Sequence, residues 1–202
     1  MIRAVRRRAV ALACALVLGV GAAGCSTDDD DAGEADAPAE TSPSAPMSPP
    51  AERTVDTKVS FGQVSGRLDR EARQRLAKQV GSVVDDWTAA AYLGGDYPRR
   101  AFADSWPGFT AGAATQARRD RALMSNQDIG DRIDGVVPRR SVVVLDVLAV
   151  QGRPAGVTAR MSLGFRTTGE VSRTVRVQGR LMLTRTDRGW RVFGYDVTKG
   201  AV

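Results

Sequence analysis

Histidine is absent from the 202-residue sequence, and its absence excludes several kinds of site. Histidine is the usual general base near neutral pH and the commonest metal ligand in proteins. Ser-His triads and ordinary zinc sites therefore cannot be built from this chain. The sequence also contains no P-loop and no G-x-S-x-G pattern. We predict a protein that has no metal site or cofactor and is not an enzyme, because catalysis would have to rely on carboxylates, tyrosines, lysines or arginines.

Long apolar runs are also scarce. The most apolar stretch reaches from Ala9 to Val20, about a dozen residues, whereas a helix needs roughly 20 residues to cross a bilayer. Four arginines precede this stretch, and the small residues Gly21 to Gly24 follow it. This order is typical of a secretory signal. We predict that residues 1–24 are a signal peptide that is cleaved.

Cysteine is nearly absent, and the position of Cys25 is informative. The sequence "AAGC" that ends at Cys25 resembles the bacterial lipobox, although that pattern usually has Leu where this chain has Ala22. The resemblance implies that Cys25 becomes a lipid-modified N-terminus carrying acyl chains such as palmitate. The protein would then be held on the extracytoplasmic face of the cell membrane. The alternative is a simple secreted protein cut near Gly24. Cys14, the other cysteine, lies inside the predicted signal peptide, so we expect no disulfide in the mature chain.

Large apolar residues are almost missing from residues 25–56, which are rich in Asp, Glu, Pro, Ala and Ser. Such a segment cannot bury enough surface to fold, so we predict a disordered acidic tether. Residues 26–55 carry eight acids against one arginine, a net charge of −7. Residues 56–202 contain 24 Lys and Arg against 15 Asp and Glu, a net charge of +9. We therefore expect residues 57–202 to form one basic domain.

The first part of this domain has a helical period. Apolar residues recur every three or four positions between about Asp69 and Leu93, which predicts a long helix that ends at Gly94. Asp69 suits the helix N-terminus, where free amide groups favour negative charge. We expect two shorter helices at about 98–104 and 109–124.

After Val136 the pattern becomes alternating, which predicts four strands. They cover about 141–150, 157–166, 175–183 and 190–197 and are separated by short turns of the kind found in antiparallel hairpins. A long N-terminal helix and two shorter helices packed on a curved antiparallel sheet describe an α+β domain.

Two stretches carry a family resemblance: "VVDDWTAAAYLGGDYPRRAF" at 83–102 and "DRGWRVFGYDV" at 187–197. Together with the order of elements, they look like the nuclear transport factor 2-like fold, a cystatin-like cone. More narrowly, the chain is similar to actinobacterial lipoproteins and Mce-associated proteins that carry such a domain beyond a membrane anchor. The resemblance implies a non-catalytic accessory or binding module with an envelope protein as its partner, for example a transport complex.

The resemblance also suggests two alternatives. One is a carrier of a small apolar ligand or lipid in the cone, and the other is a carboxylate-dependent isomerase or hydratase. The residues that we expect to line such a pocket are Trp87, Tyr92, Asp104, Trp106, Phe109 and Asp146. Core packing would explain the aromatic residues equally well.

Asp146 can be predicted to lie on either face of the sheet, because strand residues alternate between the two faces. If Val142, Val144 and Leu148 face the helices, Asp146 is buried with them and its pKa is raised. If Val143, Leu145 and Val147 face the helices, Asp146 points to water, and this is the reading we favour.

Four arginines occupy the polar positions of two consecutive predicted strands: Arg160, Arg166, Arg176 and Arg180. We expect them on one exposed sheet face, either solvated or in contact with anionic lipid or an acidic partner. We do not expect nucleic acid as a partner outside the cell.

Overall fold

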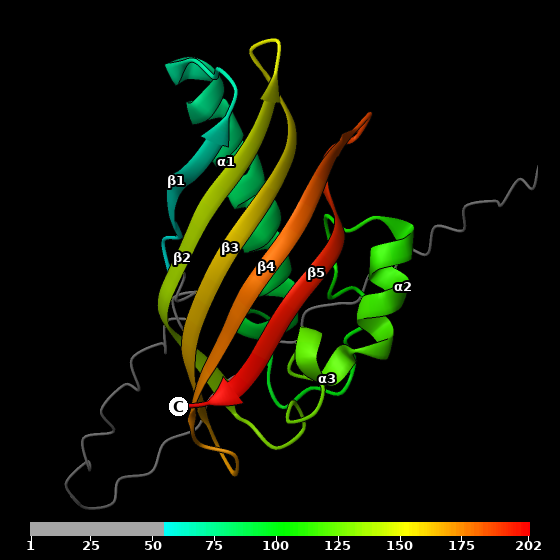
Figure 1. Cartoon of the computed structure of the whole chain (residues 1–202). Coiled ribbons are helices and arrows are strands. Elements are labelled where there is room, and N and C mark those ends of the chain that lie inside the picture. The colour runs from blue at the N-terminus through cyan, green and yellow to red at the C-terminus, as the bar shows by residue number, and fades with distance from the viewer. Residues whose placement is uncertain (1–54) are drawn as a thin grey trace, which may run out of the picture. The chain divides into compact units, whose positions relative to one another are not determined.

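Five strands and a few helices form an α+β structure with a curved mixed sheet in residues 55–202, the part of the chain that the computed structural model describes (Figure 1). In chain order the elements are β1 (Lys58–Ser65), α1 (Arg70–Thr88), η1 (Ala89–Leu93), α2 (Ala111–Arg119), α3 (Arg121–Met124), β2 (Gly135–Val150), β3 (Arg153–Thr168), β4 (Thr174–Thr186) and β5 (Gly189–Ala201). The predicted signal peptide, Cys25 and the tether as far as residue 54 lie outside the described residues.

Helix α1 and the π-helical turn η1 together occupy the predicted range of the long helix. The side chain of Asp69 caps α1, because it accepts a 2.6 Å hydrogen bond from the backbone N–H of Ala72. The apolar stripe of this helix is buried at Leu76, Val80 and Val84. None of the described helices combines the length and the apolar character needed to cross a membrane.

The two shorter helices differ from the prediction. No helix forms at 98–104, where the chain is irregular. Arg99 explains this, since its backbone N–H donates to the carbonyl of Gly130 and its guanidinium donates to the carbonyl of Ala90. These contacts fix the segment against distant parts of the chain, in an irregular conformation. The predicted helix at 109–124 is divided at Asp120 into α2 and α3.

The sheet has the strand order β1-β2-β3-β4-β5. Strands β2 to β5 form an antiparallel meander, as the alternation predicts. The prediction of a purely antiparallel sheet is wrong, because β1 pairs with β2 in parallel and had not been predicted as a strand. Only three residues of β1 face inward, and an irregularity between Phe61 and Val64 interrupts their alternation. The pattern of this strand is therefore weak in the sequence.

The two faces of the sheet have different surroundings. We call the side that packs against the helices the inner face. It buries alternate residues of every long strand, including Leu145, Leu163, Val177 and Val192. Figure 1 shows α1 crossing behind the sheet, whereas the near side, which we call the outer face, carries no helix among the described residues.

A buried lysine joins β5 to the end of the helical segment. The side chain of Lys199 is only 6% exposed. Its ammonium group donates to the carbonyl oxygens of Ala122 (2.8 Å) and Ser125 (2.7 Å) and to Oδ1 of Asp128 (2.5 Å). Burial lowers the pKa of Lys199, while the carboxylate of Asp128 acts in the opposite direction. These contacts hold α3 and the following loop against the edge strand.

Candidate functional site: the outer face of the sheet

The aromatic residues expected around a pocket lie in a packed core. Trp87 and Tyr92 are fully buried, and their ring centroids are 5.6 Å apart in an edge-on arrangement. Phe109 lies 5.7 Å from Trp87, measured between ring centroids. Trp106 is also buried. These side chains fill the space between the sheet and the helices.

Trp87 and Tyr92 use their polar atoms in hydrogen bonds within the protein. The indole N–H of Trp87 donates to the carbonyl of Met124 (3.3 Å), and the hydroxyl of Tyr92 donates to the carbonyl of Leu123 (2.7 Å). Burial raises the pKa of Tyr92 well above its usual value. Neither group is therefore presented to a ligand, and both tie the helices to the loop that follows them.

The two predicted pocket carboxylates lie away from this core. Asp104 is exposed in the irregular segment after η1. Asp146 lies on the outer face, because Val143, Leu145 and Val147 are the buried residues of β2. The favoured reading of Asp146 is therefore the one that the structure has. The six predicted pocket residues do not line a common cavity.

Asp146 is held in an ion pair instead. Its carboxylate accepts hydrogen bonds from Nε of Arg160 (2.7 Å) and from the backbone N–H of Gln63 in β1 (2.9 Å). The Arg160 side chain is the larger cause, and the Gln63 amide the second, of a lowered pKa for Asp146. Asp146 thus links three neighbouring strands, β1, β2 and β3, and its hydrogen bonds favour the ionised carboxylate.

The four predicted arginines fall into two pairs. Arg160 and Arg180 lie directly opposite each other on β3 and β4. Arg160 is paired with Asp146, and Nη2 of Arg180 lies 2.7 Å from Oδ2 of Asp196 on β5. The positive charges in the middle of the outer face are therefore compensated by acids on the flanking strands.

Arg166 and Arg176 lie nearer the other end of the same face. Arg176 lines a hollow of about 480 Å³ together with Arg139, Arg140 and the exposed Val202. Gly164 lies between Arg140 and Arg176 in the sheet register. Arg139 and Arg140 were missed, because the predicted strand began at Ser141, whereas β2 begins at Gly135.

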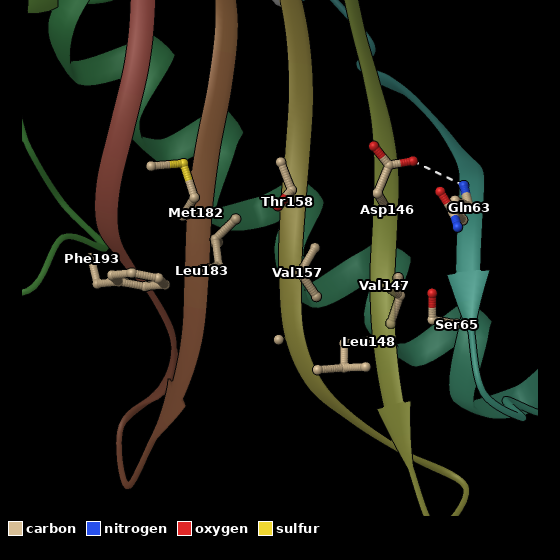
Figure 2. A pocket seen from close by; sticks show the side chains of 11 residues that line it. Gln63, Ser65, Asp146, Val147, Leu148, Val157, Thr158, Met182, Leu183 and Phe193 are labelled. Atoms are coloured by element: carbon tan, nitrogen blue, oxygen red, sulfur yellow. Dashed lines mark hydrogen bonds between the residues drawn. The ribbon is translucent and has the colours of Figure 1, made fainter.

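A second hollow, of about 370 Å³, lies towards the opposite end of the outer face (Figure 2). Leu148 and Phe193, which are 55% and 54% exposed, border it from β2 and β5. Gly156 occupies the register position next to Leu148 and has no side chain, so the floor beside Leu148 is backbone. Asp146 lines the same hollow, and Figure 2 shows its hydrogen bond to Gln63.

No group of three or more His, Cys, Asp or Glu side chains in residues 55–202 is arranged to hold a metal ion. The prominent features of the described domain are thus a filled interior and an open outer face with a basic end and an apolar end. Comparison of the chain with protein families, with curated proteins and with solved structures finds no match.

Proposed function

We propose that the protein is an extracytoplasmic lipoprotein, anchored to the cell membrane through Cys25, whose domain is a non-catalytic binding module. One structural observation supports the second part. The inner face is filled by large side chains, whereas the outer face is open and carries both hollows. A ligand or protein partner would therefore bind at the surface of the sheet. The order of arginines, apolar run and "AAGC" supports the first part.

Within this proposal the domain is a member of the nuclear transport factor 2-like group, with a cystatin-like cone. Support comes from α1, a long helix that packs across a curved sheet, and from the long antiparallel strands β2 to β5 that follow it. An envelope protein such as a transport complex is the partner that this membership implies. The outer face is the surface that we assign to it.

A carrier of a small apolar ligand is the second candidate, and it would use the outer face as well. The hollow between Leu148 and Phe193 is the feature that favours it, because exposed apolar side chains border a backbone floor there. The carboxylate-dependent isomerase is not favoured at this place. Its base would need a raised pKa, whereas the ion pair with Arg160 lowers the pKa of Asp146.

The anchor is tested by expressing the full chain in a bacterium that processes lipoproteins. We expect mass spectrometry of the membrane fraction to find a mature chain that begins at a diacylglyceryl-modified Cys25. The Cys25→Ser variant should remain unprocessed. Cys14→Ser is the matched control and should yield the same mature product as the wild type, because Cys14 is removed with the signal peptide. An unmodified Cys25 in the native protein would refute the anchor.

A further inference from the structure

Four arginines gather at one end of the outer face, and we call them the basic end: Arg139, Arg140, Arg166 and Arg176. Arg140 and Arg176 flank Gly164 on the neighbouring strands β2 and β4. Because adjacent strands lie about 4.8 Å apart, the backbones of these two arginines are about 10 Å apart. A Cβ added at Gly164 would meet no atom within 4 Å. The space above Gly164 is thus open and has arginines on both sides.

No acidic side chain among the described residues is paired with the arginines of the basic end. None of its four arginines takes part in an ion pair within residues 55–202, unlike Arg160 and Arg180. The residues that line the hollow include no Asp or Glu side chain. The next register row towards the middle of the sheet contains no acid either: Lys58, Val142, Ser162, Gln178 and Thr198. The basic end is therefore a local concentration of positive charge rather than part of a charge network.

The chain enters the domain beside this end. Lys58, the first residue of β1, pairs with Val142 of β2, two positions from Arg140. A hydrogen bond of 2.6 Å joins the hydroxyl groups of Thr57 and Ser141. The segment that leads from Cys25 to the domain therefore arrives next to the basic end. In a protein anchored at Cys25, the anchored segment is therefore joined to the domain at this end of the sheet.

We propose that the basic end binds the phosphate groups of anionic phospholipids and docks the domain on the bilayer surface. The guanidinium group is planar and always charged, and it donates paired hydrogen bonds to phosphate oxygens. The backbone floor at Gly164 allows a headgroup phosphate to approach between Arg140 and Arg176. An acidic protein could be attracted by the same charge, but the point of chain entry favours the lipid surface. This inference rests on the proposed anchor for its orientation, whereas the affinity for lipid is a property of the domain.

The test uses a chain that begins at Ser26, added to preformed vesicles. Every residue of the core and its flanking apolar shell lies between Val59 and Val197, so this chain retains the whole described fold. We expect co-sedimentation with vesicles that contain phosphatidylglycerol and none with vesicles of phosphatidylcholine alone. The variant Arg140→Gln/Arg176→Gln should bind about thirtyfold more weakly, or about fivefold for each arginine removed.

Arg160→Gln/Arg180→Gln is the matched control, because it removes the same net charge from the same face. Arg160 lies four residues from Gly164 along β3, or about 14 Å, which exceeds the Debye length of about 10 Å at 0.1 M salt. We therefore expect this variant to bind within about threefold of the wild type. Circular dichroism of both variants checks that each is folded.

Three outcomes would overturn the inference. Equal weakening of the two double variants would show that overall charge, not the basic end, determines binding. Binding that is independent of phosphatidylglycerol, or lost in Phe193→Ser but kept in Arg140→Gln/Arg176→Gln, would assign docking to the apolar hollow. Absence of binding to either vesicle, for a folded chain, would leave an acidic protein as the partner. Each of these results is compatible with a lipid-modified Cys25, so failure here is distinguishable from failure of the anchor.

Discussion

The chain has three tyrosines, and the environment of each one opposes ionisation. Burial raises the pKa of Tyr92 and is also the main cause of the raised pKa of Tyr97. Burial raises the pKa of Tyr195 as well, and the nearby carboxylate of Asp120, which accepts a 2.6 Å hydrogen bond from its hydroxyl, adds to the effect. We predict that the folded protein contains less tyrosinate than the unfolded chain at about pH 10.5, where an ordinary tyrosine is about three-quarters ionised.

The same shifts determine how stability depends on alkaline pH. A tyrosine whose pKa is raised by folding stabilises the native state fully below pH 10, and this contribution is lost as the pH rises through the folded pKa. One group contributes a slope of about 1.4 kcal/mol per pH unit, so the three together give at most about 4 kcal/mol per pH unit. The partial exposure of Tyr195 reduces its share. Lys199 acts in the opposite direction: because folding lowers its pKa, its contribution to stability increases with pH until about pH 10.4, the pKa of an ordinary lysine.

The assay follows tyrosinate absorbance and far-ultraviolet circular dichroism in one alkaline titration. We expect tyrosinate absorbance to appear at a higher pH than in free tyrosine, and most of its change to accompany the loss of dichroism, because folding opposes the ionisation of all three tyrosines. Tyr97→Phe should reduce the absorbance change by a third and make the loss of stability with pH shallower. Gradual ionisation with a midpoint near pH 10, while the dichroism remains native, would refute the reasoning.

Three other predictions concern stability. Lys199→Met should lower the free energy of unfolding, measured by urea denaturation, by about 2 to 3 kcal/mol, since the carbonyls and the carboxylate that Lys199 binds lose their donor. The control is Lys78→Met, on the exposed surface of α1, which should change the free energy of unfolding by less than about 0.5 kcal/mol. Gly179→Ala should lower the free energy of unfolding by about 1 to 3 kcal/mol or more, because φ is +149° and the new Cβ would lie 2.1 Å from a backbone carbonyl oxygen. Gly164→Ala, with open space above it, should cost less than about 1 kcal/mol, and similar losses for the two glycines would contradict the geometry. Asp146→Asn should lower the free energy of unfolding by at most about 1 kcal/mol above pH 4. The difference between the variant and the wild type should disappear as acid protonates the carboxylate of Asp146, and a constant difference down to pH 2 would exclude the ion pair as the cause.

The parts of the fold that could be predicted are those with a sustained period. Five alternating apolar positions in β3 and a repeating stripe in α1 leave one arrangement that buries them. Strand β1 could not be predicted, because its alternation of inward and outward residues is interrupted before Val64 and its partner strand lies about 80 residues later in the chain. The segment 98–104 was wrongly predicted as helical because the bonds that decide its shape, from Arg99 to Ala90 and Gly130, join distant residues.

In the candidate site, too, the features that depend on neighbouring residues could be predicted, and those that depend on contacts between distant residues could not. Alternation alone places Arg160, Arg166, Arg176 and Arg180 on one face and makes them equivalent. The cross-strand register then separates them, since the acids that compensate Arg160 and Arg180 lie 14 and 16 residues away in the sequence. A one-residue slip of β2 against β3 would turn Asp146 to the inner face and leave Arg160 unpaired. The division of the outer face into a neutral middle and a basic end is therefore a property of the register, and the lipid-binding proposal depends on that division rather than on the net charge of the domain.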